Sequence, residues 1–246
     1  MKQIREDGIT DRDLIVGGSS ATPHDYPYFV HLDTPGCGGT LIAPDIVLSA
    51  GHCRLDDMSG YGTVKVGRYT KYDNLDQSEE FTVVDQVRHP NYDGDVCCGS
   101  SDGTWFKAVH YDFLLLKLSG RSSAQTIRLN RNGNIPRTDE NLHVIGFGDI
   151  DPMTDNFITP DMIHEVTVNY RPNDVCIRDS DAYPDYLLNE ASLCAYDNGE
   201  DACGGDSGGP LIRKGQTDAQ DIQVGIVSWY VCFINYFQIS FFGEGL

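Results

Sequence analysis

Short apolar segments bounded by turn residues recur along almost the whole chain. They are rich in valine, isoleucine, leucine and aromatic residues, and they occur at 26–32, 39–50, 62–67, 81–87, 112–118, 142–148, 164–170, 208–212 and 222–231. Several alternate apolar with polar positions, which is typical of strands, and their regular spacing is typical of a β-sandwich or barrel. Helical periodicity is nearly absent, and only residues 172–183 suit a short helix. We therefore expect an all-β fold.

The composition is that of a globular protein. The chain has 246 residues, of which 40% are hydrophobic and 22% are charged. Its formal net charge is −19, from 18 basic and 37 acidic residues, which disfavours nucleic acid or an anionic membrane as a partner. The apolar run 224–234 is far shorter than the ~20 residues of a membrane-spanning helix. We therefore expect neither nucleic acid nor a membrane as a partner.

Eight cysteines suggest an oxidising compartment, where they can form disulfides. No C-x-x-C pair occurs among them, which argues against a structural zinc site; they stand at positions 37, 53, 97, 98, 176, 194, 203 and 232. The first 14 residues contain no apolar segment of the signal-peptide type. The secreted location that the cysteines suggest therefore requires either a longer N-terminus or another route of export.

The segment DACGGDSGGPLI, residues 201–212, places one serine, Ser207, between two glycine pairs. Glycine, serine and aspartate are common in turns, and GDSGG also fits G-x-S-x-G, the nucleophile motif of α/β-hydrolases. A serine nucleophile needs a histidine base that is oriented by a carboxylate. All seven histidines precede Ser207, whereas α/β-hydrolases place the histidine after the serine. The α/β-hydrolase fold is therefore rejected.

Two chain orders of such a triad remain, His–Asp–Ser and Asp–His–Ser. The second belongs to a subtilisin-type α/β fold, whose helices this sequence does not show. The first requires an early histidine at the end of a strand and an aspartate before an apolar strand. The segment SAGHC supplies His52 after an apolar run, and YDFLLLKL supplies Asp112, whose downstream neighbours indicate burial. The sequence therefore predicts a triad of His52, Asp112 and Ser207.

The sequence resembles the chymotrypsin/trypsin-type (S1 family) serine proteases. Four segments in family order carry the resemblance over roughly residues 15–229: IVGG at 15–18, GGTLIAPDIVLSAGHC at 38–53, HPNYD at 89–93 with DFLLLKL at 112–118, and CGGDSGGPLI at 203–212. The resemblance implies two six-stranded antiparallel β-barrels with the active site in the cleft between them. It also implies a set of domain limits: a pro-segment at 1–14, a first barrel at about 15–122, a linker at about 123–140, and a second barrel at about 141–246.

By this resemblance, His52 is the general base and then the general acid, Asp112 orients it, and Ser207 is the nucleophile. The backbone N–H groups of Gly205 and Ser207 form the oxyanion hole. Cleavage before Ile15 frees an ammonium group that pairs with Asp206 and orders that hole.

Further implied features concern the specificity pocket and the disulfides. Asp201 would lie at the pocket floor and pair with substrate lysine or arginine, while Ser228, Trp229 and Tyr230 would also contact the substrate. The implied disulfides are Cys37–Cys53, Cys176–Cys194 and Cys203–Cys232. Cys97 and Cys98 have no family counterpart, and a vicinal disulfide and free or intermolecular thiols both remain open.

The sequence departs from the family pattern at several positions. Leu14 stands where a basic residue usually precedes the cleavage site, Tyr230 stands in place of a pocket glycine, and the tail at 233–246 is atypical. The loop at 68–80 resembles the family's calcium loop, with Asp76 and Glu79 as candidate ligands, but Arg68 stands where a further ligand carboxylate would be needed. A cation there competes with calcium, for example by pairing with Glu79, so no metal is expected in this loop.

These features predict a secreted serine endopeptidase that cleaves after lysine or arginine, acts without a cofactor, and is a monomer. Its partners would be protein or peptide substrates, an activating protease and protein inhibitors. Two alternatives remain open. One is a catalytically impaired, protease-like binding domain, and the other is an elastase-like specificity, because Tyr230 narrows the pocket.

Overall fold

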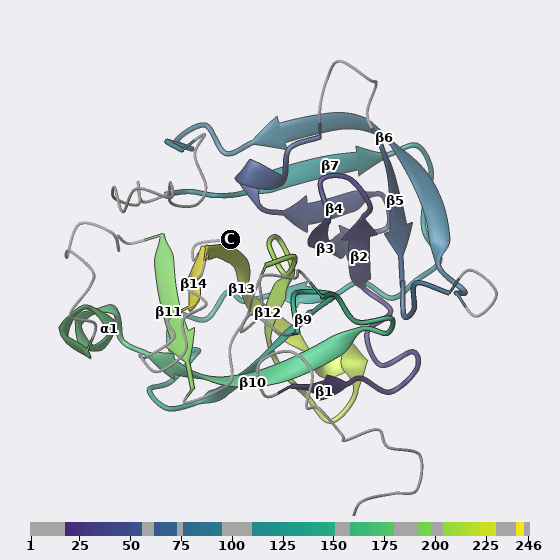
Figure 1. Ribbon diagram of the computed structural model, residues 1–246. Coiled ribbons are helices and arrows are strands. Elements are labelled where there is room, and N and C mark those ends of the chain that lie inside the picture. The colour runs from purple at the N-terminus through teal and green to yellow at the C-terminus, as the bar shows by residue number, and fades with distance from the viewer. Residues whose placement is uncertain are drawn as a thin grey trace, which may run out of the picture.

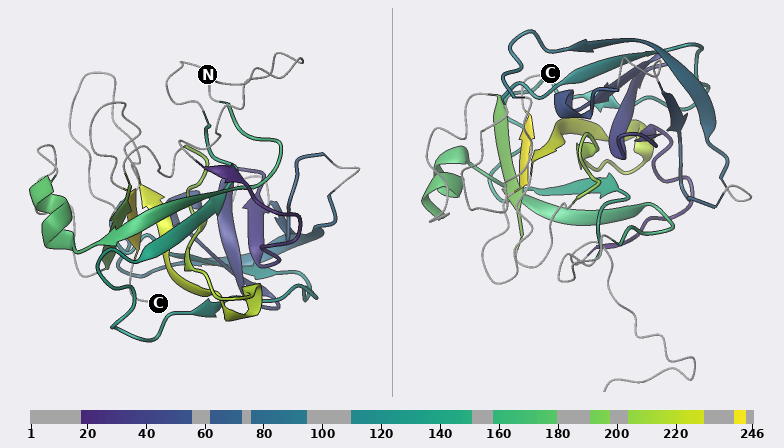
Figure 2. Two further views of the ribbon diagram at one scale, coloured as in Figure 1. Left: turned by 90° about the horizontal axis from the view of Figure 1, so that it is seen from below. Right: turned by 45° about the horizontal axis from the view of Figure 1, so that its top comes forward.

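The computed structural model describes residues 18–55, 62–72, 76–94, 110–150, 158–179, 191–197, 204–229 and 240–243. Its strands form two units that lie side by side, one built by the N-terminal half of the chain and the other mainly by the C-terminal half (Figure 1). The short helix α1 (Asn173–Asp179) lies on the outside of the second unit in both further views (Figure 2). This helix falls within the segment 172–183 for which a helix was expected.

The first unit is a closed barrel of six antiparallel strands. Its order is β2-β3-β4-β7-β6-β5, and β5 pairs with β2 to close it. The strands are β2 (Phe29–Leu32), β3 (Cys37–Ala43), β4 (Ile46–Ser49), β5 (Thr63–Val66), β6 (Glu79–Arg88) and β7 (Leu114–Leu118). Along β7, buried and exposed residues alternate, as expected for a strand with one face on a core.

The second unit has six main strands, and their pairings also form a closed circuit. The strands are β9 (Asn141–Gly146), β10 (His164–Arg171), β11 (Ser192–Tyr196), β12 (Pro210–Arg213), β13 (Ile222–Trp229) and β14 (Ser240–Gly243). They pair antiparallel in the order β9-β10-β11-β14-β13-β12, and β12 pairs with β9 again. The predicted chymotrypsin-like fold of two six-stranded units is therefore confirmed.

Two short strands extend this second unit. Strand β1 (Ser19–Ser20) pairs antiparallel with β10, and β8 (Arg128–Leu129) pairs parallel with β13. The segment 123–140, which was expected to be a linker, thus contributes a strand to the second unit. Among the described residues, no helix has both the length and the apolar character needed to cross a membrane.

Buried side chains connect the two units. The core of the first barrel continues into apolar residues of the second unit, namely Ile145, Phe147, Ile212 and Ile226. A buried hydrogen bond adds to this contact, because the Tyr28 hydroxyl before β2 donates to Asp221 Oδ2 at 2.5 Å, just before β13. The junction between the units is therefore a packed interior, and the residues at its edge are held in fixed positions.

His31 in β2 is a histidine of this packed interior, and it is 8% exposed. Its ring lies edge-on to the Phe147 ring, with the centroids 5.2 Å apart. Burial, followed by the nearby Arg68 cation, lowers the pKa of His31 from 6.5 to about 4. The folded protein therefore keeps this imidazole neutral at mildly acidic pH.

We expect this histidine to make the folded state sensitive to acid. The unfolded chain protonates His31 near pH ~6.5, but the folded chain does so only near pH ~4. The contribution of neutral His31 to the free energy of unfolding is therefore complete above about pH 6.5 and is lost as the pH falls toward about 4. Between about pH 7.5 and about pH 4.5, the free energy of unfolding should fall by about 2–3 kcal/mol more in the wild type than in His31→Gln. Urea unfolding with the disulfides intact measures this. His24→Asn, at an exposed position, serves as the control, and an equal pH dependence of His31→Gln and wild type would contradict the expectation.

Candidate active site

The strand register of the first barrel brings His52 and Asp112 together. His52 lies in a 3-10 turn (Gly51–Cys53) that follows β4, and Asp112 lies just before β7. Strands β4 and β7 are paired, with Ser49 opposite Leu114. The residue that follows one strand and the residue that precedes the other therefore emerge at the same edge of the barrel.

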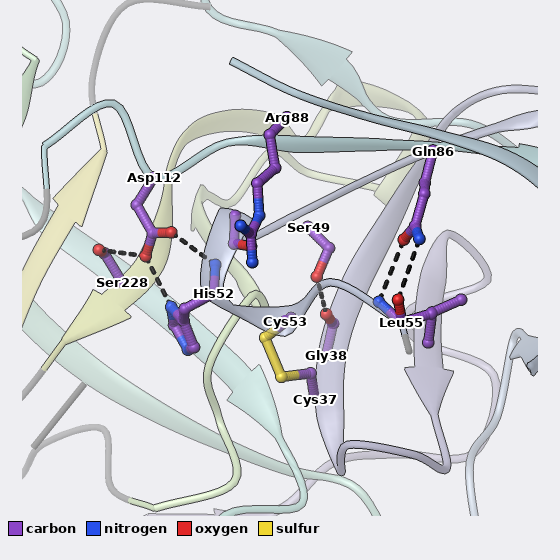
Figure 3. The surroundings of a disulfide bond; sticks show 11 residues. Cys37, Gly38, Ser49, His52, Cys53, Leu55, Gln86, Arg88, Asp112 and Ser228 are labelled. Carbon is purple, nitrogen blue, oxygen red and sulfur yellow. Dashed lines mark hydrogen bonds and ion pairs between the residues drawn. A yellow bond between two sulfur atoms is a disulfide. The ribbon is translucent and has the colours of Figure 1, made fainter. Parts of the chain in front are cut away.

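The Asp112 carboxylate accepts three hydrogen bonds at this edge (Figure 3). The backbone N–H of His52 donates to Oδ1 at 2.8 Å, and His52 Nδ1 lies 2.7 Å from Oδ2. The Ser228 hydroxyl donates to the same Oδ2 at 2.6 Å. Asp112 is 1% exposed, so these donors replace the water that a buried carboxylate has lost. A carboxylate at Nδ1 favours the tautomer with its proton there, which leaves Nε2 to act as the base.

Ser228 was expected to contact the substrate, which stays a prediction, and in the structure its hydroxyl has a partner within the chain. The hydroxyl bonds to Asp112, which is 116 positions away in the chain. The local sequence around Ser228 does not indicate which side chain its hydroxyl will meet. Only the folded structure could reveal this third donor to the carboxylate.

The turn that carries Ser207 is fixed against both units. The Ser207 carbonyl accepts a hydrogen bond from Gly38 of β3 at 2.7 Å, and the N–H of Gly208 donates to Val227 of β13 at 2.7 Å. Gly208 has a φ of +77°, and a Cβ there would lie 2.3 Å from Ser49 Oγ. The chain must therefore have glycine at this position to bring Ser207 so close to the strand end that leads to His52.

The two residues before Ser207 have distinct environments. Gly205, expected in the oxyanion hole, is half-buried with a φ of 96°. Asp206 is completely buried, and its Oδ1 accepts the N–H of Gly148 at 2.9 Å. A Cβ at Gly146 or Gly148 would lie 2.1 or 2.2 Å from its carboxylate oxygens, so only glycines fit around this side chain.

Two of the three implied disulfides are present in the structure. Cys37–Cys53 joins β3 to the turn that carries His52 (Figure 3), and Cys176–Cys194 joins α1 to β11. The first one holds the His52 turn against the neighbouring strand.

Several other predicted residues lie outside the described residues: Ile15, Cys97, Cys98, Asp201, Cys203, Tyr230 and Cys232. Trp229 ends β13, and the backbone at its position pairs with Phe241.

The expected pair between Arg68 and Glu79 is wrong. Arg68 is buried and forms an ion pair with Asp33, and its Nε lies 3.9 Å from Asp76 Oδ2. Glu79 instead accepts hydrogen bonds from the hydroxyls of Ser122 and Ser123 at 3.3 and 2.7 Å. The reason is that the end of β2 brings Asp33 to the guanidinium, while Glu79 faces the segment after β7. The Arg68 cation therefore lies between Asp33, which follows β2, and Asp76 of this loop.

Potential metal ligands also gather beside the His52 turn. In the part of the chain that the structure describes, one such group lies close together, namely Cys37, His52 and Cys53. Its two sulfur atoms are bonded to each other, and a disulfide sulfur is not the thiolate that binds metals. As long as this disulfide is intact, His52 is the only member of the group that can offer a ligand atom.

Comparisons with known proteins agree with this geometry. The profile of the family described as Trypsin matches residues 15–240. Glandular kallikrein from Sus scrofa and thrombin-like enzyme elegaxobin-2 from Protobothrops elegans are each 31% identical to the chain, covering 87% of it and 84% of their own length. Kallikrein-2 from Homo sapiens is also 31% identical, over 87% of this chain and 78% of its own.

A solved structure shows the same fold. It is that of neuropsin, a serine protease expressed in the limbic system of mouse brain, with a TM-score of 0.71 and 22% identity. The match covers 92% of this chain and 93% of neuropsin. The family profile and the kallikrein relatives, taken together with this shared fold, lead to one conclusion: the chain is a member of the trypsin (S1) family of serine proteases.

Proposed function

We propose that this protein is an active serine endopeptidase, with Ser207 as nucleophile, His52 as base and Asp112 as the orienting carboxylate. The observation that carries the proposal is the buried Asp112 carboxylate, which lies 2.7 Å from His52 Nδ1 and accepts two further hydrogen bonds. This geometry supports an imidazole that is held in one tautomer with Nε2 ready to accept a proton. The fixed turn that carries Ser207 supports a nucleophile on a rigid support.

The proposed reaction proceeds through an acyl-enzyme. Ser207 Oγ attacks the peptide carbonyl while its proton passes to His52 Nε2, and Asp112 stabilises the imidazolium that forms. The N–H groups of Gly205 and Ser207 would bind the oxyanion, and each such donor is typically worth ~3–4 kcal/mol of barrier. His52 then gives its proton to the leaving amine, and water, activated by the same histidine, hydrolyses the acyl-enzyme.

The proposed substrates are proteins or peptides with lysine or arginine at the cleaved position. Asp201, six residues before Ser207, would supply the carboxylate that pairs with that cation. Tyr230 supports the alternative of an elastase-like preference, since tyrosine stands at the sequence position where the family pattern has the glycine of the pocket wall.

The proposed setting is outside the cell. Two disulfides in the structure support secretion, as does the similarity to a venom protein, snake venom serine protease serpentokallikrein-2. We propose further that the protein is a monomer, which an activating protease processes and protein inhibitors control.

Labelling with a fluorophosphonate probe tests this function directly. We expect the processed protein to become labelled at Ser207, as located by mass spectrometry of its peptides, and to cleave a peptide library after lysine or arginine. Ser207→Ala should remove the label, whereas Ser123→Ala, at an exposed serine, should not. A processed, folded protein without label or cleavage would favour the binding-domain alternative. Cleavage after small apolar residues would favour the elastase-like alternative.

A further inference from the structure

Arg88 lies where the two elements that carry His52 and Asp112 meet. It is the last residue of β6 and pairs in register with Leu114, the first residue of β7. Leu114 in turn pairs with Ser49, the last residue of β4. Arg88, Leu114 and Ser49 thus lie side by side across three paired strands. Leu114 and Ser49 are two and three residues from Asp112 and His52, and the backbone pairing of Arg88 fixes it beside them.

The side chain of Arg88 reaches the turn that carries His52 (Figure 3). Its Nε donates to the carbonyl oxygen of Gly51 at 2.7 Å, and its guanidinium carbon lies 4.6 Å from the centre of the Tyr92 ring. A hydrogen bond from a charged donor is stronger than one between neutral groups, and the face of an aromatic ring attracts a cation. The guanidinium therefore holds the carbonyl and the ring together.

The turn needs such attachments, because it is short and its own cap is weak. It comprises only Gly51–Cys53, and its N-cap residue Ala50 makes no side-chain hydrogen bond. Asp112 holds it through the N–H of His52, and the disulfide of Cys53 holds its far end. The bond from Arg88 to the residue just before His52 adds a third attachment, from the side of β6.

The fit around Gly51 is also close. A Cβ on Gly51 would lie 2.8 Å from Tyr92 Cδ2 and 2.9 Å from Asp112 Oδ1. The backbone at Gly51 therefore lies directly between the aromatic ring and the carboxylate that orients His52. Any movement of this backbone changes the contacts of both groups.

We propose that Arg88 is a positioning residue for His52. By holding the Gly51 carbonyl against Tyr92, it keeps the imidazole aligned between Asp112 and Ser207. The proposal rests on the proposed peptidase function. Because Arg88 acts through the backbone of Gly51, its loss should slow the chemical step and leave substrate binding nearly unchanged.

Steady-state kinetics of the processed protein test this role. Arg88→Met keeps an unbranched apolar side chain as far as the Nε position but removes the donors and the charge, and Arg88→Lys keeps the charge. Arg128→Met is the matched control, because the Nη2 of this exposed arginine also donates to a backbone carbonyl, that of Gln220 at 3.0 Å. We expect Arg88→Met to lower kcat about tenfold or more with KM within about twofold, because a small misplacement of a catalytic group slows the reaction strongly. Arg88→Lys should recover part of the loss, and Arg128→Met should match the wild type.

Other outcomes separate the possibilities. Equal kcat in Arg88→Met and Arg128→Met would overturn the proposal, as would a raised KM with unchanged kcat. A lower melting temperature with an unchanged kcat of the folded protein would indicate a purely structural role and would also overturn it. A wild type without fluorophosphonate label refutes the peptidase function instead. In that case the positioning role is tested by the NMR chemical shift of the proton between His52 Nδ1 and Asp112. This chemical shift should change in Arg88→Met and not in Arg128→Met, and an unchanged value in Arg88→Met would overturn the positioning role.

Discussion

Replacing Asp112 by asparagine is expected to lower kcat by about 10⁴-fold, the size typical of this change in a serine protease triad, while KM changes little. In this structure the carboxylate accepts hydrogen bonds from His52 N and Ser228 Oγ and lies against His52 Nδ1. An amide has one oxygen to accept with, and its NH2 group must face one of these donors. If the NH2 group faces Nδ1, it stabilises the tautomer whose proton is on Nε2, and that histidine cannot act as base.

The measurement is kcat of processed Asp112→Asn with a peptide substrate, at a temperature where circular dichroism shows the variant folded. Asp45→Asn is the matched control, because Asp45 belongs to the same barrel and pairs with Lys117 at 2.6 Å on the surface. It should retain the activity of the wild type. If Asp112→Asn kept its activity within about tenfold of the wild type, the assigned role of this carboxylate would be wrong, because such triads lose far more.

The uncut chain is expected to be less active than the chain that begins at Ile15, by on the order of 10²- to 10³-fold. That factor corresponds to the loss of one oxyanion-hole donor. We propose that the ammonium group freed at Ile15 pairs with Asp206, which is completely buried against Gly148, and that this pair fixes the N–H groups of Gly205 and Ser207. A free α-amino group titrates near pH ~8, and an anion beside it raises that pKa. Activity should therefore fade only in alkaline solution.

Three forms of the protein measure this switch: the full chain, the chain that begins at Ile15, and a chain with one extra glycine before Ile15. The third form has nearly the same length but carries its charge at the wrong atom, so it should behave like the uncut chain. Full activity with Met1 still at the N-terminus would refute the switch. Since Leu14 is not basic, the full chain should not process itself if it cleaves after lysine or arginine.

Much of the fold could be predicted because its strands show a clear alternation. In β7 the leucines at 114, 116 and 118 face the core, whereas Leu115 and Lys117 do not. A period of two read along the chain corresponds directly to the two faces of a strand. The pairing of β8 with β13 could not be read in this way, because a strand of two residues has no measurable period.

The candidate triad could be predicted for a different reason, namely the order of its members in the chain. All histidines precede Ser207, and that order excludes folds before any distance is known. The partners of the triad could not be predicted, because they depend on contacts between distant segments. The bond from Ser228 to Asp112 joins the two units, and the pairing of Arg68 with Asp33 joins residues 35 positions apart, so local sequence encodes neither contact.

The pairing of β1 with β10 has a consequence for how quickly a new N-terminus is captured. Ser19 is already paired with Glu165. In a chain cut before Ile15, the new amino group is therefore tethered to Ser19 by four residues, which extend to about 14 Å at most. An amine confined to so small a volume has an effective concentration in the millimolar range or above, regardless of how dilute the protein is. Amines at micromolar concentration in solution would thus compete poorly with the new N-terminus for Asp206. The pairing would be intramolecular, so its rate would depend on the motion of the chain itself and not on the protein concentration.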